Sequence, residues 1–229
     1  MNSDIKKSRF FPGINFKQVV KNFIHNAFGH PLYLITHPIK GFDEFKREKT
    51  SKGEVAIFYL LMMIITQIIA YNKNGFLINR QNPDDFNLFL TIALVVFPVL
   101  IGTVGNWSIT VLMDGKGTMK EIFHVICYAF FPYVWLGLLS TLISNFITID
   151  EVIFFNFFSG LGALLLVYTL FFGLMGIHEY GLLKTIFMIL ATIVAIAVIL
   201  FIMLLFLSLI QQVYSYLSSV YREFVMRFL

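Results

Sequence analysis

The sequence is poor in charged residues and contains almost no cysteine. Lysine, arginine, aspartate and glutamate make up 13% of the 229 residues, whereas 58% are hydrophobic and 27 are phenylalanine. A water-soluble domain of this length needs more charge at its surface, so the composition excludes that class and indicates a protein of the lipid bilayer. The single cysteine, Cys127, lies in an apolar stretch and excludes a disulfide framework within the chain.

Patterns typical of catalysis and metal binding are also missing. No serine stands in a Gly-x-Ser-x-Gly elbow. His178-Glu179 lacks the second histidine, four residues away, of the helical zinc motif. The long apolar stretches contain no lysine, arginine, aspartate or glutamate, which argues against an ion-coupled pump. We therefore predict that the protein is not an enzyme and has no metal site and no cofactor.

Five apolar stretches are long enough to cross a bilayer as helices. A hydrocarbon core about 30 Å thick needs roughly 20 apolar residues in helical form, because backbone groups in lipid must bond to one another. The predicted fold class is all-α, a polytopic membrane helical bundle of five transmembrane helices. The stretches are Val55–Tyr71, Phe86–Met113, Ile122–Ile147, Ile153–Ile177 and Thr185–Ile210.

The basic residues are shared unequally between the two sides that five spans define. Thirteen of the 17 lysines and arginines lie in residues 1–53 or in the second and fourth connectors, and four lie on the other side. Lysine and arginine collect on the cytoplasmic side of membrane proteins. We therefore predict a multi-pass protein of the cell membrane, with its amino terminus in the cytoplasm and its carboxyl terminus on the far side.

Both ends of the chain have the pattern of amphipathic interfacial helices. Lys17, Lys21 and His25 recur four residues apart, opposite an apolar helical face. Such a helix lies in the membrane surface with its basic face toward anionic headgroups, although a partner-binding helix has the same pattern. The predicted organisation is a basic cytoplasmic arm (1–53), a membrane domain (54–210) and an amphipathic carboxyl-terminal helix (211–229).

The most distinctive polar segment joins the second and third spans. Asp114–Thr118 reads Asp-Gly-Lys-Gly-Thr and predicts a tight turn, because its glycines allow positive φ. Thr118 and Glu121 have the spacing of a capping box at the start of the next helix. The Walker spacing is absent and no strand precedes the turn, so the turn interpretation is preferred over nucleotide binding.

Polar residues gather, by topology, at the cytoplasmic ends of the second, third and fourth spans. In one interpretation they cap helices and form local ion pairs. In the other they form a polar vestibule that binds an ion, a lipid headgroup or a partner segment. The candidate binding residues are Asn106, Asp114, Lys116, Lys120, Glu121, His124, Tyr128, His178 and Glu179.

These residues, with the five spans and the basic amino terminus, resemble the bacterial branch of the Yip (Ypt-interacting protein) family. The resemblance covers roughly residues 36–212 and is most specific over residues 106–133. Eukaryotic members bind Rab-type GTPases, but their Asp-Leu-Tyr-Gly-Pro motif is missing here, so the resemblance does not extend to GTPase binding. The residues that carry it are Asn106-Trp107, Asp114–Thr118, Lys120-Glu121-Ile122-Phe123, Tyr128, Pro132-Tyr133 and His178-Glu179-Tyr180.

The resemblance implies a non-enzymatic role in the membrane. The resemblance also implies a gene neighbourhood, since the genes of bacterial members often accompany genes for sugar-uptake ABC transporters. We therefore expect an accessory or scaffold protein that associates with another membrane complex, such as an ABC importer permease, and no nucleic-acid partner. The alternative is a transport or lipid-handling protein whose pocket is lined by Asn106, His124, Tyr128 and His178. Small residues at helix-packing spacings suit packing within the bundle, and they also allow homo-oligomers.

Overall fold

The computed structural model describes residues 21–79 and 82–228, and every regular element in these ranges is helical. Five helices are long and apolar enough to cross a membrane. The predicted all-α membrane bundle is thereby confirmed, and its first four spans agree with the predicted stretches to within a few residues. The five helices are α4 (Gly53–Lys73), α5 (Leu88–Met113), α6 (Met119–Ile143), α7 (Val152–His178) and α8 (Leu182–Phe228).

Shorter helical elements precede and connect these spans. Pro31 and Pro38 lie in the first turns of two of them, where the missing N–H of proline costs no helical hydrogen bond. The elements before the first span are a π-helical turn (His25–Gly29), α2 (His30–Thr36) and α3 (Pro38–Arg47), and two 3-10 turns in the connectors are Pro83–Asp85 and Ile149–Glu151.

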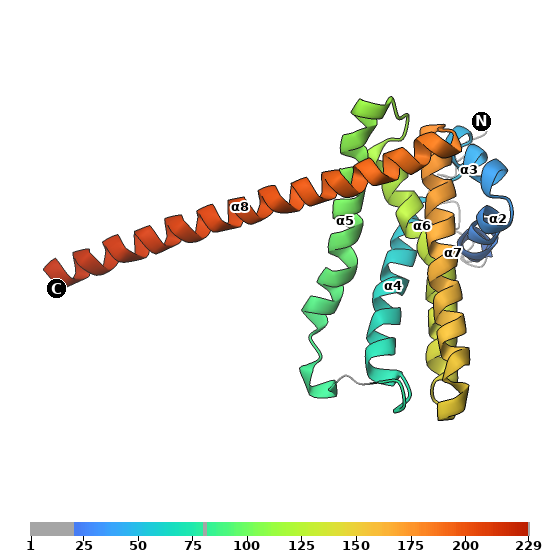
Figure 1. The fold of residues 1–229 in the computed structure, drawn as a ribbon, viewed down its shortest axis with the longest axis horizontal. Helices are drawn as coiled ribbons and strands as arrows, with labels where there is room; N and C mark the ends of the chain where they lie inside the picture. Colours follow the sequence, from blue (N-terminus) through green and yellow to red (C-terminus); the bar gives the residue numbers. More distant parts are fainter. Residues whose placement is uncertain (1–20, 80–81, 229) are drawn as a thin grey trace, which may run out of the picture.

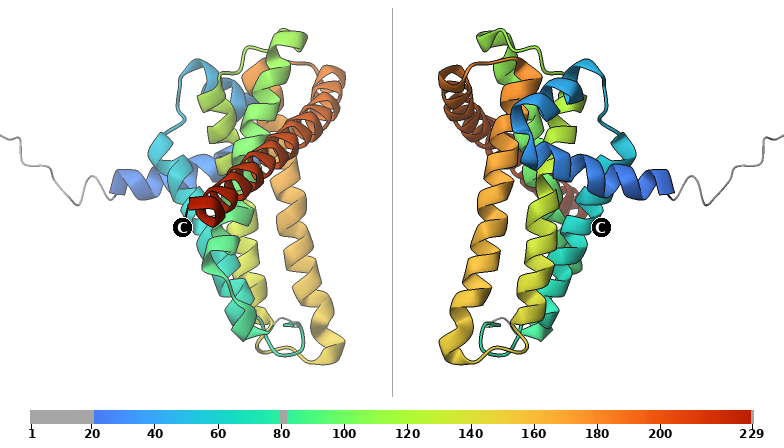
Figure 2. Two further views of the ribbon diagram at one scale, coloured as in Figure 1. Left: turned by 90° about the vertical axis from the view of Figure 1, so that its left-hand side faces the viewer. Right: turned by 90° about the vertical axis from the view of Figure 1, so that its right-hand side faces the viewer.

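Helices α4 to α7 run alternately up and down as a bundle (Figure 1). The connector between α5 and α6 lies at the same end as α2 and α3, and we name this end the α5–α6 end. The loop between α4 and α5 lies at the opposite end, the α4–α5 end. Residues 21–29 extend crosswise to the bundle axis (Figure 2), as expected of a helix in the membrane surface.

An aromatic side chain that packs against two glycines holds the amino-terminal helices to the bundle. Phe42 of α3 is fully buried and packs on α7 at Gly173 and Gly176. A Cβ at Gly176 would lie 2.6 Å from the Cβ of Phe42, and one at Gly173 would lie 2.5 Å from Cγ1 of Val125. These small residues therefore serve packing within the chain, one of the two roles that their spacing allows.

Helix α8 departs from the bundle. It crosses α5 near the α5–α6 end and then runs out sideways, away from the other spans (Figure 1). Close crossing depends on Gly105, where a Cβ would lie 2.6 Å from Cγ1 of Ile196. The helix is unbroken for 47 residues, because Leu182–Phe228 contains neither glycine nor proline. The amphipathic segment expected from residue 211 onward is thus a continuation of α8 without a break at residue 210.

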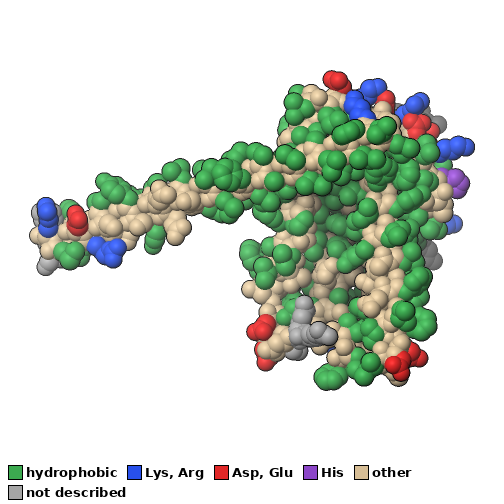
Figure 3. Space-filling model, viewed as in Figure 1, with side chains coloured by type: hydrophobic (Ala, Val, Ile, Leu, Met, Phe, Trp, Pro, Cys, Tyr) green, Lys and Arg blue, Asp and Glu red, His purple; other side chains and the backbone are tan. Residues whose placement is uncertain are grey.

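The two ends of the bundle differ in the charge that they carry. On the face seen in Figure 3, lysine and arginine side chains gather together with acidic ones at the α5–α6 end, whereas the charged side chains seen at the opposite end are acidic. The acidic residues of the two 3-10 turns there are Asp84, Asp85, Asp150 and Glu151. The part of the amino-terminal arm that the structure describes and the connectors α5–α6 and α7–α8 were expected to share one side of the membrane. They lie at the same end of the bundle (Figure 1).

Candidate functional site

The turn between α5 and α6 has the predicted capping box but a different backbone. Thr118 accepts from the backbone N–H of Glu121, and the Glu121 carboxylate accepts from the backbone N–H of Thr118, which confirms the capping box. Among the described residues no glycine has a positive φ, so the turn does not use the positive φ that its glycines allow. Asp114 is the left-handed residue, with φ 51°, and it ends α5.

The glycines of this turn are needed for space. A Cβ at Gly115 would lie 2.5 Å from the hydroxyl of Tyr180 and 2.6 Å from Nδ1 of His178. A Cβ at Gly117 would lie 2.7 Å from Cε1 of the same histidine. The rings of His178 and Tyr180 stack with centroids 5.2 Å apart. The Gly-Lys-Gly turn and the His-Glu-Tyr segment at the end of α7 thus fit against each other.

A buried chain of hydrogen bonds, which we name the His178 network, links this turn to α5, α7 and α8. The backbone N–H of Gly117 lies 3.2 Å from Nδ1 of His178 and donates to it. That bond leaves Nε2 as the protonated nitrogen, and Nε2–H donates to Oδ1 of Asn106 at 2.9 Å. The amide nitrogen of Asn106 then donates to Oγ1 of Thr192 at 3.1 Å and to Sδ of Met188 at 2.8 Å.

The His178 network is almost completely enclosed by protein. The exposed fractions are 1% for His178, 2% for Asn106 and 1% for Met188. A buried polar side chain is costly unless it is bonded, and here each of the two central side chains is bonded on both sides. The network therefore fixes the start of α8 against α5 and α7.

Two ion pairs surround the network at the surface. Nζ of Lys46, on α3, lies 2.7 Å from the carboxylate of Glu121 and donates to the carbonyl of Lys116 at 2.8 Å. Lys116 in turn pairs with Glu179 at 2.6 Å. The hydrogen bond from Lys116 holds the pKa of Glu179 below its usual 4.5. The turn is consequently tied to α3 on one side and to the end of α7 on the other.

His124 and Tyr128 form a second set of contacts with the segment that leads into α4. Nδ1 of His124 lies 3.2 Å from the hydroxyl of Ser51. The Tyr128 hydroxyl accepts from the backbone N–H of Lys52 at 3.1 Å, and its ring meets that of His30 edge-on. Both residues lie on α6 and bond to the amino-terminal arm, whereas Asn106 and His178 bond to each other.

Seven of the nine candidate binding residues take part in these contacts, and the other two are Asp114 and Lys120. Asp114 and Lys120 face solvent at the α5–α6 end. Within residues 21–79 and 82–228 no three histidine, cysteine, aspartate or glutamate side chains are grouped as metal ligands would be. The capping box of Thr118 and Glu121 and the two ion pairs are bonds of the kind expected in the first interpretation, whereas the vestibule interpretation stays a prediction.

The amino-terminal basic residues are only partly described. Lys17 lies outside the described residues, whereas Lys21 and His25 are exposed. The segment is held to the first span by the Tyr59 hydroxyl, which donates to the carbonyl of Ala27 at 2.6 Å. Residues 21–29 therefore pack on α4 by one face and keep the two basic side chains free of that contact.

Sequence reasoning missed several partners of the site. Lys46 belongs to a charged segment whose position relative to the turn is set only by the fold. Met188 and Thr192 lie four residues apart on α8, and in sequence they look like ordinary residues of an apolar span. The one available signal was Tyr180, next to His178-Glu179, whose hydroxyl donates to the carbonyl of Met113.

A family model described as the Yip1 domain matches residues 32–224, which is most of the chain. No curated protein and no solved structure matches.

Proposed function

Because this chain belongs to the Yip1 domain family, we propose that it is a non-enzymatic accessory or scaffold protein that associates with another complex in the membrane. The rigid charged turn at the α5–α6 end supports this role. Two ion pairs and the His178 network hold the turn in place, while Lys120 and Asp114 remain exposed. A pre-ordered charged surface loses little conformational entropy when a partner binds.

Helix α8 supplies a second surface for a partner. The most apolar window of α8 is 0% buried by the rest of the chain. Helices in lipid associate through close packing and hydrogen bonds with neighbouring helices. A helix that extends away from its own bundle is therefore free to pack against a span of another protein.

The proposed partner is the permease of an ABC importer for sugars. The resemblance to bacterial Yip proteins supports this choice, since their genes often accompany such importers. A bacterial cell membrane is the proposed location, with the α5–α6 end in the cytoplasm. The collection of lysine and arginine at that end supports this orientation.

The test is to purify the tagged full chain from its native membrane in mild detergent and to quantify co-purifying chains by mass spectrometry. Lys120→Glu reverses the exposed charge beside the turn, and Lys73→Glu is the matched control at the opposite end. We expect importer subunits with the wild type and with the control, and about fivefold less with Lys120→Glu, the effect of roughly 1 kcal/mol. Recovery without any importer subunit, or equal recovery with both variants, would overturn the proposal.

A further inference from the structure

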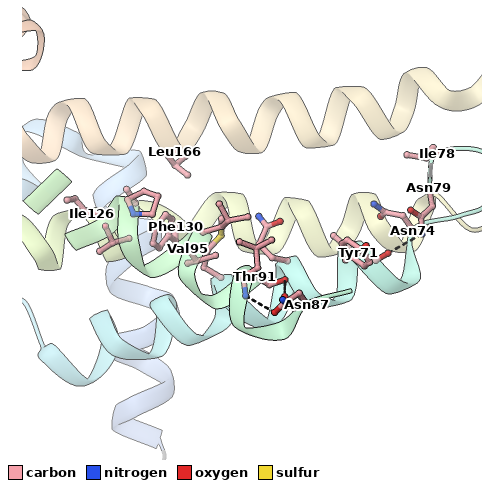
Figure 4. Close-up of a pocket in the computed structure, with 18 of the residues that line it drawn as sticks. Tyr71, Asn74, Ile78, Asn79, Asn87, Thr91, Val95, Ile126, Phe130 and Leu166 are labelled. Atoms are coloured by element: carbon pink, nitrogen blue, oxygen red, sulfur yellow. Dashed lines mark hydrogen bonds between the residues drawn. The ribbon is translucent and has the colours of Figure 1, made fainter. Parts of the chain in front are cut away.

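The bundle contains a large cavity that the proposed function does not use. Its volume is about 930 Å³, and it lies between α4, α5, α6 and α7 toward the α4–α5 end (Figure 4). Ligand pockets in proteins span roughly 300–1,000 Å³, so the cavity has room for a complete small ligand. None of the four residues predicted to line the pocket of a transport or lipid-handling protein, Asn106, His124, Tyr128 and His178, lines it.

The lining changes from polar to apolar along the bundle axis. Tyr71 and Asn74 at the end of α4, with Asn87 and Thr91 at the start of α5, form the polar mouth. The deeper lining residues are Val95, Val99, Ile126, Phe130, Leu166 and Leu170. Asn87 and Val99 are separated by about 18 Å of helix, which exceeds half of a hydrocarbon core about 30 Å thick. The apolar part therefore reaches the depth of an acyl chain in one leaflet.

Two amide side chains in the lining have unmet hydrogen-bonding capacity. Oδ1 of Asn74 is buried and has no hydrogen-bond partner in the described part of the chain. Gln67, which is half-buried, lies two helical turns deeper on α4, and no hydrogen bond joins it to another described residue. By contrast, Asn87 already accepts from the backbone N–H of Leu90, and the Tyr71 hydroxyl donates to the carbonyl of Asn82.

Oδ1 of Asn74 is buried and Gln67 is half-buried, and an amide group without a partner is costly both in protein interiors and in lipid. The carbonyl of Asn74 needs a donor near the mouth, and the amide nitrogen of Gln67 needs an acceptor below it. Asp85 is the charged residue among the described lining side chains, and it lies at the mouth. Its carboxylate favours a cation and opposes an anion.

We propose that this cavity binds a membrane lipid with an amine-bearing, zwitterionic headgroup, of the phosphatidylethanolamine class. The ammonium group donates to the Asn74 carbonyl and pairs with Asp85. An ester carbonyl accepts from the amide of Gln67. One acyl chain then runs along Val95, Val99 and Phe130 toward the middle of the bilayer.

The shape of the molecule allows a lipid to enter from the bilayer. In Figure 3 the surface is hollowed below α8, between α5 and α7. Leu94 on α5 and Leu166 on α7 line the cavity from its two sides. Leu94 is 66% exposed and Leu166 is half-buried. The cavity is thus bordered by apolar side chains that face lipid as well as its interior.

The test measures which lipid the full chain retains. The protein is placed in nanodiscs made of equal amounts of phosphatidylethanolamine and phosphatidylglycerol and then released into native mass spectrometry. Val95→Trp fills the apolar part of the cavity. Val111→Trp is the matched control, since it is the same change on the same helix at a side chain that is 81% exposed and outside the lining.

We expect the wild type and Val111→Trp to retain phosphatidylethanolamine with roughly tenfold preference over phosphatidylglycerol, and Val95→Trp to retain roughly tenfold less. Gln67→Leu combined with Asn74→Leu should abolish the preference. If Val95→Trp does not fold, Thr91→Trp at the mouth replaces it. Equal retention by the cavity-filling and control variants, or equal retention of the two lipids by the wild type, would overturn the proposal.

Discussion

At the scale of single residues, the turn between α5 and α6 shows why glycine occurs where it does. Gly115 and Gly117 have ordinary backbone angles, and the left-handed position is taken by Asp114. The glycines are required because the rings of His178 and Tyr180 occupy the positions where a side chain would begin. Their identity thus depends on residues more than 60 positions away in the chain.

Gly117→Ala tests this explanation. Its Cβ would meet a histidine ring that is bonded at both nitrogens and has no room to move. We expect the free energy of unfolding to fall by about 1–3 kcal/mol, as in overpacked cores, measured by thermal unfolding in one detergent. Gly160→Ala is the control, because nothing lies within 4 Å of its added Cβ. A loss of stability as large in the control would contradict the packing explanation.

His30, which starts α2 and lies outside the membrane spans, predicts a pH dependence. Burial is the main cause that holds its pKa below the usual 6.5; Lys52 lowers it further and Glu44 opposes the shift. The unfolded chain therefore binds a proton more readily than the folded chain. The stability contributed by neutral His30 is present above pH 6.5 and is lost as the pH falls below that value.

The measurement compares unfolding temperatures at pH 7.5 and pH 5.5 for the wild type and His30→Gln. Glutamine keeps a polar group near Thr50, which bonds Nε2 of His30 at 3.0 Å, but it does not titrate. We expect a smaller drop in stability on acidification in the variant than in the wild type. The same drop in both proteins would show that other groups cause the pH dependence.

At the scale of helices, local sequence patterns predicted most helix boundaries, but they did not predict the contacts between residues far apart in the chain. The spans follow from the length of the apolar stretches, and the start of α6 follows from its capping box. The pairing of Lys46 with Glu121 joins residues 75 positions apart, and no local pattern reports it. Helix α8 continues past residue 210 because nothing in its sequence stops a helix.

The Lys46–Glu121 pair should couple α3 to α6. Both side chains are half-buried, with exposed fractions of 17% and 18%. A double-mutant cycle with Lys46→Ala and Glu121→Ala should give a coupling energy of about 1 kcal/mol or more, measured by denaturation. The exposed Asp43–Arg47 pair on α3 is the control, and exposed pairs contribute about 0.3–0.5 kcal/mol. Equal coupling in the two cycles would contradict a special role for Lys46.

At the scale of the whole molecule, the distribution of charge predicts the orientation in the membrane. Lysine and arginine collect at the α5–α6 end (Figure 3). Single cysteines at Lys73 and Lys120 report the two ends once Cys127, which is buried, has been replaced by alanine. In intact cells we expect a membrane-impermeant maleimide to label Lys73→Cys and not Lys120→Cys. The reverse pattern would invert the orientation.

The sequence by itself determined the membrane class, the helical fold and the number of spans. These properties follow from composition and from the length of apolar stretches, because backbone groups in lipid are satisfied only within helices. It also located the polar residues of the α5–α6 end, since their order along five spans places them on one side.

Only the tertiary structure decided which of these residues bond to one another. It divided the polar set into the His178 network and the contacts of His124 and Tyr128. It also directed α8 away from the bundle and opened a cavity at the end opposite the predicted vestibule. Such features depend on how whole helices pack, and helix packing joins residues whose separation in sequence carries no local signal.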